Sequence, residues 1–142
     1  MFEITEIHTL NEDTNAYTYV NANAFTFHDV FDPMTNTMSR APELRAAYLP
    51  KNLKSIGGWA FRDAVKLTTV TLSDNIEIIE GQAFALSNTY AGVTMPLVIN
   101  ELPANLKTLG SSVFAGVSPT TIKVTYLPDG LTSIGATTFQ YC

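Results

Sequence analysis

The chain of 142 residues has the length of one ordinary domain, and its 46% hydrophobic and 15% charged residues exclude a disordered polymer. Its formal net charge is −5, and its eight Lys and Arg residues form no run, which argues against nucleic-acid binding. A single cysteine, Cys142, excludes an internal disulfide framework and any zinc site of the CxxC type.

The first residues carry no pattern typical of an export signal. Glu3 and Glu6 stand where a signal peptide would have basic residues, and no apolar stretch follows them. The longest apolar runs in the chain are a few residues, so no membrane span is predicted. The compartment stays open: the cell surface or the exterior if a signal was removed, otherwise the cytoplasm or a virus particle.

The first 43 residues are the least regular part of the chain. The segment from Val20 to Phe25 repeats half of a pattern that recurs downstream, and Tyr17 fills the apolar position before it. We expect residues 1–43 to form a divergent first coil that caps the core. The segment from His28 to Arg40 contains a proline and several Thr and Asn residues, and we expect it to be an inserted surface loop.

From residue 44 onward, one pattern recurs four times. It reads L-P-x-x-L-x-x-I-G-x-x-A-F, at steps of 23, 30 and 25 residues, and it begins at Leu49, Leu72, Leu102 and Leu127. A further apolar residue stands five positions before each start, at Leu44, Leu67, Leu97 and Ile122. A period of this length predicts a solenoid in which each repeat forms one coil. We therefore expect about four coils in residues 44–142, the last one incomplete, within a single solenoid domain.

Three apolar ladders follow from stacking these coils. They consist of Leu53, Ile76, Leu106 and Leu131; of Ile56, Ile79, Leu109 and Ile134; and of Phe61, Phe84, Phe114 and Phe139. Burying each such side chain contributes about 1.5–3 kcal/mol before conformational entropy is counted. Glycine follows the second ladder in three coils, which predicts either a positive φ or a close approach of two backbones there. Glu80 breaks this rule in the second coil.

The residues before each starting leucine alternate as a short strand does. Val70 and Leu72 are expected to point inward and Thr69 and Thr71 outward, in a parallel sheet along one side of the solenoid. The aligned outward positions form two rows, Ala46, Thr69, Ile99 and Val124, and Tyr48, Thr71, Glu101 and Tyr126. In the last two coils Asn100 and Thr125 fall on inward positions, so a slip of one residue would exchange the two faces there.

Two further features bear on contacts with a partner. Residues 87–96 lengthen one step to 30 residues and are expected to form a second surface loop, whose Tyr90 and Met95 suit adaptable contacts. Trp59 stands two residues before a ladder Phe. It is either a partly exposed contact residue or a cover over the first coil.

The last residues interrupt a coil. After Phe139 the chain reaches Cys142, and the strand that would complete the coil is missing. We expect either a fragment of a longer repeat protein or an open last coil that meets a partner or another copy of the chain.

The repeated pattern, followed by L-x-x-V-x-L, resembles the BspA-type leucine-rich repeat. The resemblance covers residues 44–142 well and 13–43 in part. It implies a mainly β solenoid of stacked short parallel strands with loops and short helical turns, and a role in adhesion to host proteins or other cells. Repeats of this family usually carry a cysteine three residues after the Ala-Phe pair. Cys142 stands at that place after Phe139, which favours a packing role over a reactive thiol.

No catalytic constellation with suitable spacing is present. His28, Asp29 and Asp32 lie in the first insertion without a third ligand at helical spacing or a nearby cysteine. There is no Gly-x-Ser-x-Gly turn and no glycine-rich phosphate loop. We therefore predict no enzyme, no cofactor and no metal.

The leading hypothesis is a non-enzymatic, adhesin-like module that binds another protein through its strand face and its insertions. Its candidate contact residues are Tyr48, Thr69, Thr71, Ile99, Glu101, Val124, Tyr126, Trp59 and Tyr90. The alternative is a structural component of an assembly, such as a phage virion or a multimeric surface layer, with contacts between copies through the last coil.

Overall fold

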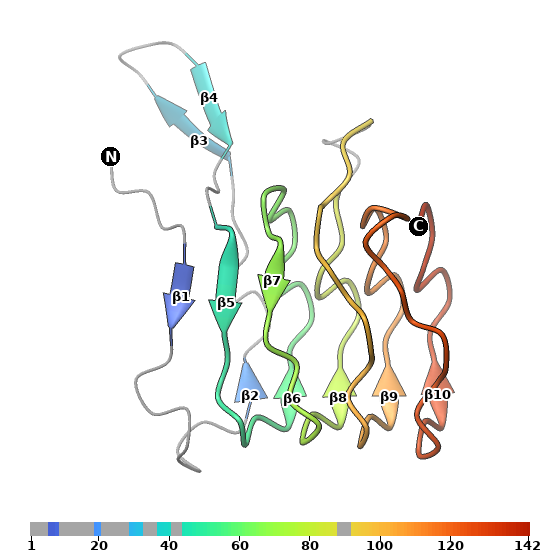
Figure 1. Cartoon of the computed structure of the whole chain (residues 1–142). Coiled ribbons are helices and arrows are strands. Elements are labelled where there is room, and N and C mark those ends of the chain that lie inside the picture. Colours follow the sequence, from blue (N-terminus) through green and yellow to red (C-terminus); the bar gives the residue numbers. More distant parts are fainter. Residues whose placement is uncertain (1–5, 9–18, 21–28, 33–36, 41–43, 88–91) are drawn as a thin grey trace.

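The computed structural model describes residues 6–8, 19–20, 29–32, 37–40, 44–87 and 92–142. In this part the chain winds into a stack of coils, with short strands and no helix (Figure 1). The strands are β1 (Glu6–His8), β2 (Tyr19–Val20), β3 (Asp29–Asp32), β4 (Thr37–Arg40), β5 (Ala46–Tyr48), β6 (Ser55–Ile56), β7 (Thr69–Val70), β8 (Ile78–Ile79), β9 (Thr108–Leu109) and β10 (Ser133–Ile134).

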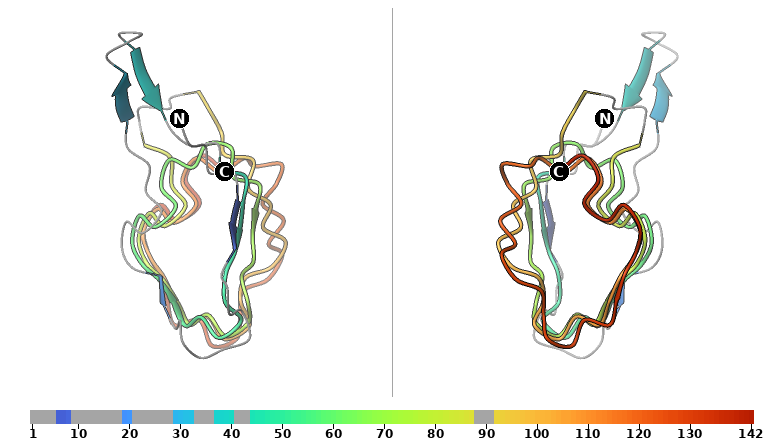
Figure 2. Two further views of the ribbon diagram at one scale, coloured as in Figure 1. Left: turned by 90° about the vertical axis from the view of Figure 1, so that its left-hand side faces the viewer. Right: turned by 90° about the vertical axis from the view of Figure 1, so that its right-hand side faces the viewer.

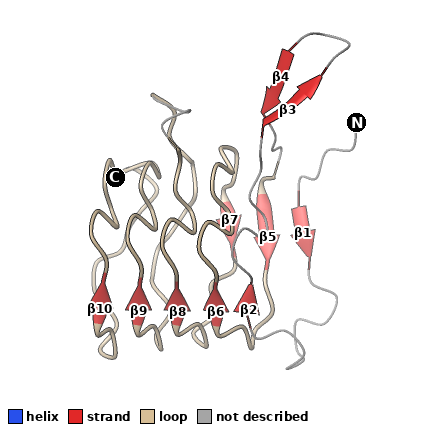
Figure 3. Ribbon diagram, turned by 180° about the vertical axis from the view of Figure 1, so that it is seen from behind, coloured by secondary structure: helices blue, strands red, loops and turns tan. Residues whose placement is uncertain are grey.

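Two parallel sheets run along the solenoid. Sheet A has the strand order β1-β5-β7, and sheet B has the order β10-β9-β8-β6-β2. Viewed along the stack, the two sheets lie on opposite sides of the coils (Figure 2), and the row of sheet B strands is seen from behind in Figure 3. The predicted parallel sheet is thus confirmed as sheet A in the first two full coils, and the third and fourth coils are joined on this side by a single bridge between Ile99 and Ile122. Sheet B was not predicted, because its two-residue strands are too short to show a period of two.

The register of sheet B follows the sequence repeat. Ile56 pairs with Ile79, Ile79 with Leu109, and Leu109 with Ile134, so one position of the pattern occupies one ladder. Val20 of β2 pairs with Ile56, which is the alignment that the half pattern of Val20 to Phe25 predicts. The backbone pairing of the second ladder therefore extends by one coil toward the N-terminus.

The ladder side chains form the core. In the first three full coils the members of both aliphatic ladders are completely buried: Leu53, Ile56, Ile76, Ile79, Leu106 and Leu109. The Phe rings of successive coils stack nearly parallel, with centroids 5.2 Å apart between Phe61 and Phe84, 5.8 Å between Phe84 and Phe114, and 5.6 Å between Phe114 and Phe139. The predicted apolar core is confirmed in the first three full coils, whereas in the fourth coil Leu131 is only partly buried and Ile134 exposes 46% of its surface. Stacked aromatic pairs of this spacing are favourable.

Each L-P-x-x-L segment forms a single turn between the sheets. The N–H of the second leucine position donates to the carbonyl three residues earlier in all four coils: Leu53 to Pro50, Ile76 to Ser73, Leu106 to Pro103 and Leu131 to Pro128. The short helical turns that the resemblance implied are therefore isolated turns in the described residues. The proline fits because its missing N–H is not needed as a donor in the turn.

A left-handed residue recurs in every full coil, one position before the alanine of the pattern. The φ angles are 59° at Trp59, 58° at Gln82, 55° at Ser112 and 57° at Thr137. A second left-handed residue follows four positions later in three coils, at Asp63, Gly116 and Tyr141. Each coil bends inward after its sheet B strand (Figure 2). Left-handed residues are suited to such sharp reversals, and most of these positions lack glycine.

The two insertions differ from their predicted form. The first is a hairpin, because β3 and β4 pair antiparallel from Asp29 with Arg40 to Asp32 with Thr37, and it projects from the end of the stack (Figure 1). The first insertion therefore contains paired strands, where a surface loop was expected. In the second insertion Met95 is fully buried and bridges Val117 in the next coil, so it is a core residue rather than a contact residue.

Candidate interaction surface

The outer face of sheet A begins in the first two full coils. Thr69 and Thr71 are exposed and Tyr48 is half-buried, as the alternation predicts. Ala46 pairs with Thr69 on the same face but is buried. The hydroxyl of Thr71 accepts a hydrogen bond from the N–H of Leu49 at 2.7 Å, and the hydroxyl of Thr68 donates to the carbonyl of Arg45 at 2.9 Å. Threonine on this face therefore also joins neighbouring coils.

The alternation changes phase in the third and fourth coils. Ile99 exposes only 3% of its surface and Val124 packs half-buried against the core, so the expectation that both point outward was wrong. The physical reason is that the period of two starts at Leu97, which puts Leu97 and Ile99 on the core face together. The bridge between Ile99 and Ile122 keeps this phase in the next coil.

The outward side chains of the last two coils are consequently a different set. Val98, Asn100, Lys123 and Thr125 are exposed on the sheet A side of these coils. Glu101 is exposed as well, and Tyr126 exposes 58% of its surface, so these two remain accessible. We call the exposed residues of this side the strand face: Thr69, Thr71, Val98, Asn100, Lys123 and Thr125.

Trp59 lies on another side of the coil, after sheet B. It exposes 43% of its surface, and the Cζ atom of Arg62 lies 5.8 Å from its ring centroid. Of the two alternatives for Trp59, a partly exposed contact residue fits this exposure better than a side chain that covers the first coil. Tyr90 lies outside the described residues.

A charged ladder lies beside sheet B. Lys107 Nζ donates to Glu77 Oε2 at 2.9 Å, and Lys54 Nζ lies 3.8 Å from Glu77 Oε1. The hydrogen bond from Lys107 and its charge lower the pKa of the Glu77 carboxyl below its ordinary value, with a smaller contribution from Lys54. Because these groups are exposed, the ladder aligns coils more than it stabilises them.

Cys142 shows little sign of reactivity. Its thiol donates to the carbonyl of Phe114, with an S···O distance of 3.1 Å, and burial raises its pKa. A raised pKa reduces the fraction of the nucleophilic thiolate. In the part of the chain that the structure describes, no group of three or more His, Cys, Asp or Glu residues is arranged to hold a metal ion.

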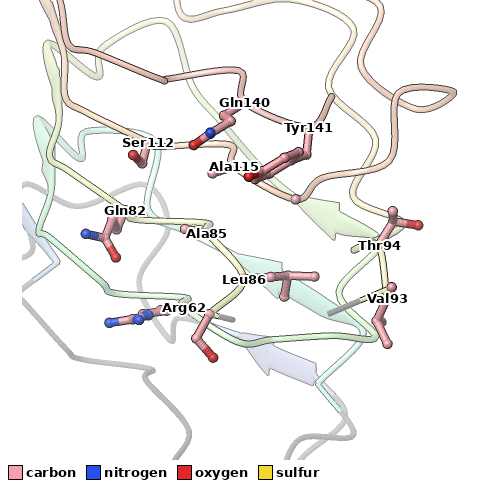
Figure 4. A pocket seen from close by; sticks show the side chains of 13 residues that line it. Arg62, Gln82, Ala85, Leu86, Val93, Thr94, Ser112, Ala115, Gln140 and Tyr141 are labelled. Atoms are coloured by element: carbon pink, nitrogen blue, oxygen red, sulfur yellow. The ribbon is translucent and has the colours of Figure 1, made fainter. Parts of the chain in front are cut away.

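Among the described residues, two hollows in the surface are large enough to consider as binding sites. One is a groove of about 620 Å³ on the side of the left-handed bends, with Arg62, Gln82 and Ser112 along one side, Val93 and Thr94 along the other, and Leu86 between them (Figure 4). The other, of about 410 Å³, lies at the last coil among Ile122, Val124, Tyr126, Leu127 and Phe139.

The first groove was not predicted from the sequence. One available signal was the position after each ladder Phe, where the small residues Ala85 and Ala115 lie between the large residues Arg62 and Gln140. Residues from the second insertion form the far wall, and no repeat pattern indicates where they fold.

Stacked coils, two parallel sheets and a ladder core define this chain as a solenoid of the leucine-rich repeat class. A family model for the BspA-type leucine-rich repeat region matches residues 13–142 in six copies, and the chain belongs to that family. Leucine-rich repeat domains are in general protein-binding modules and not enzymes.

Solved structures agree with this fold. A leucine-rich repeat protein of T. pallidum is 23% identical over 88% of this chain, with a TM-score of 0.58, and a leucine-rich repeat protein of Bacteroides ovatus is 21% identical over 94%, with a TM-score of 0.50. The matched regions cover 48% and 32% of those two proteins. Curated protein sequences yield no match. Within the described residues, no helix is long and apolar enough to cross a membrane.

Proposed function

We propose that this chain is a non-enzymatic, adhesin-like module that binds another protein through its strand face. The observation that supports this most is the run of exposed Thr, Val, Asn and Lys side chains over adjacent coils. Sheet A joins the first two of these coils, and backbone hydrogen bonds from Val98 to Thr68 and from Lys123 to Ile99 join the next two. Such a surface offers hydrogen-bonding and apolar groups without needing to rearrange, which lowers the entropic cost of association.

Tyrosines extend this surface at both ends of the described coils. Tyr48 is half-buried beside Thr71, and Tyr126 is largely exposed on the fourth full coil. Tyrosine gives a large contact area with few rotatable bonds and is enriched among the residues that dominate binding energy. Glu101 lies between them and would favour a partner with basic groups nearby.

Site-specific photocrosslinking tests this proposal. A benzophenone amino acid is placed at Thr71 or Val98 on the strand face, and at Ile78 on the outer face of sheet B as the matched control. Presented to host cells or extracts, the strand-face variants should crosslink to the same partner protein, while the control should not. Crosslinks of equal yield from all three positions, or none from the strand face, would eliminate this face as the binding surface.

Once a partner is captured, alanine substitutions rank the contacts. Tyr126→Ala and Val98→Ala should each weaken binding by about tenfold or more if they dominate the interface. Ile99→Ala is unsuitable for this purpose, because Ile99 is buried and its removal would damage the core instead.

A structural role in an assembly is the second candidate, and a specific feature supports it. The fourth full coil exposes 49% of Leu127 and 46% of Ile134, beside the hollow that Tyr126 lines. Apolar groups on one coil end could stack against another copy. Sedimentation of the 142-residue chain over a wide concentration range should then show self-association that Ile134→Glu abolishes. A monomer at every concentration would remove this candidate.

A further inference from the structure

The groove beside the left-handed bends has a shape set by one position of the repeat. The residue after the ladder Phe is Arg62 in the first full coil, alanine in the second and third, and Gln140 in the fourth. Two small residues between two large ones leave a depression that runs across the coils. Val93 and Thr94 form its far wall, and Leu86 lies between this wall and Arg62 (Figure 4). Its volume of about 620 Å³ lies within the range of ligand sites, about 300–1,000 Å³.

Most backbone hydrogen-bonding groups at these four positions are already used. The N–H groups of Arg62, Ala85, Ala115 and Gln140 each donate to the carbonyl three residues earlier. The carbonyls of Ala85, Ala115 and Gln140 accept from Asp63, Leu86 and Gly116. This row of residues therefore offers little to an added β-strand, and we expect recognition to come mainly from side chains.

The charge in the groove is positive and incompletely neutralised. Arg62 is the one ionised residue among those that line it, in a chain whose net charge is −5. The Nε atom of Arg62 is buried and has no hydrogen-bond acceptor among the described residues, because Asp63 Oδ2 lies 3.9 Å away and Asp63 Oδ1 accepts from the N–H of Ser87. The rest of the guanidinium group lies against Trp59, and the side chain is 31% exposed.

A partly exposed guanidinium group whose Nε atom has no acceptor is complementary to a carboxylate. Gln82 on one coil and Gln140 two coils away add amide groups that can both donate to and accept from peptide groups. Ala85 and Ala115 leave room for a chain to lie between them.

We propose that this groove binds a short extended segment of the partner protein that carries a Glu or Asp side chain, with its carboxylate on Arg62 and the adjoining peptide groups on Gln82 and Gln140. This inference rests on the proposed function and adds a second contact, on the opposite side of the coils from the strand face. The specificity for an acidic residue resides in Arg62.

Titration with two matched peptides tests the proposal. The probes are N-acetyl-Ala-Glu-Ala-Ala-amide and its Gln counterpart, added to the ¹⁵N-labelled chain and followed by amide chemical shifts. The Glu peptide should shift the amides of Ala85, Ala115 and Gly116 and bind about tenfold more tightly than the Gln peptide. Equal affinities, or shifts confined to the strand face, would overturn the proposal. So would saturable binding of cellobiose in the groove with neither peptide bound, since that would identify a carbohydrate site.

Two variants separate recognition from folding. Arg62→Ala should lose the preference for the Glu peptide, whereas Lys123→Ala, which removes the same charge from the strand face, should retain it. Ala115→Leu fills the groove without touching the charge and should weaken both peptides alike. Each variant is compared with the parent by its melting temperature, and an Arg62→Ala chain that melts like the parent yet still prefers Glu would refute the role of Arg62.

Failure of the groove proposal can be distinguished from failure of the proposed function. If crosslinks form at Thr71 but Arg62→Ala leaves partner affinity unchanged, the strand face stands and the groove proposal falls. If the Glu peptide binds in the groove while no strand-face crosslink forms, the strand-face function falls and the groove stands as an independent peptide site.

Discussion

Successive coils approach so closely at two glycines that no side chain fits between them. A Cβ atom on Gly110 would lie 2.7 Å from the carbonyl carbon of Glu80 and 2.8 Å from the Cα of Gly81, and one on Gly135 would meet Gly110 and Ser111. Neither glycine has a positive φ. Of the two explanations that the pattern allowed, close approach is therefore the one that holds. Glu80 also has an ordinary φ, and its carboxylate accepts the N–H of Gly58 at 2.9 Å.

Gly110→Ala should therefore destabilise the chain by about 1–3 kcal/mol, because the methyl group would displace backbone rather than a flexible side chain. Gly130→Ala is the matched control: nothing lies within 4 Å of its Cβ position and its φ is not positive, so alanine should be neutral or stabilise by up to about 1 kcal/mol. Urea unfolding of the two variants measures both effects. Equal stability of the variants would contradict the close contact.

The left-handed positions make a different demand on the residue. Gln82 has a φ of 58°, in a region that costs most non-glycine residues about 1–2 kcal/mol and that asparagine adopts more readily. Gln82→Asn should leave the melting temperature unchanged or raise it, whereas Gln82→Val should lower the unfolding free energy by about 1–2 kcal/mol, since β-branched side chains are least tolerated there. Circular dichroism melts compare the two. A valine variant as stable as the asparagine variant would argue for another backbone conformation at this position.

These residue-scale features show where sequence reasoning succeeds. The glycine pattern indicated that something special happens after the second ladder, because a missing side chain is visible in the sequence. The left-handed row was invisible, because Trp, Gln, Ser and Thr share no chemical property that marks such a φ. Arg62 could not be recognised as a site residue either, because the groove beside it depends on Ala85 and Ala115, which belong to other coils.

At the scale of the strand, side-chain burial decides the phase. Val70 is buried in β7, but the third coil buries Ile99 at the position aligned with Thr69. The repeat pattern aligned Ile99 with Thr69 correctly but assigned Ile99 to the solvent face. The core face is favoured instead, because burying the two apolar side chains Leu97 and Ile99 stabilises the coil more than keeping the phase of the repeat. Sequence alone could identify the ambiguity there but not resolve it.

The charged ladder beside sheet B predicts a pH dependence. Lys107 lowers the pKa of Glu77 in the folded chain below the ordinary value of 4.5, so the carboxylate stabilises the fold above that value. This contribution disappears as the pH falls through the lowered folded pKa. Parent and Glu77→Gln should therefore differ slightly in melting temperature at neutral pH and converge in acid, and the difference should shrink in high salt.

A double-mutant cycle isolates the pair behind this effect. In a Lys107→Met background, Glu77→Gln should change the melting temperature much less than it does in the parent, because the donor at 2.9 Å is absent. A melting difference that is independent of pH, or that persists in the Lys107→Met background, would show that Glu77 acts through something other than this ion pair.

On the scale of the whole molecule, stability should be local. Each coil contacts mainly its neighbours, so the solenoid lacks a single centre and its stability is a sum of coil and interface contributions. The amides of Glu80, Gly110 and Gly135 occupy one template position and donate to the carbonyls of Ile56, Ile79 and Leu109 at 2.9, 2.8 and 2.7 Å. Their hydrogen bonds are equally good, and only the packing around them differs.

Hydrogen exchange of the 142-residue chain should reveal that difference. Ile79 and Leu109 are fully buried on either side of Gly110, whereas Ile134 beside Gly135 exposes 46% of its surface. We expect the Gly135 amide to exchange at least about tenfold faster than the amides of Glu80 and Gly110, because the coil can open with little loss of buried apolar surface. A single common rate would instead mean that the coils open as one cooperative unit. In that case the packing of the Phe stack across all four coils, rather than each interface in turn, would set the stability of the solenoid.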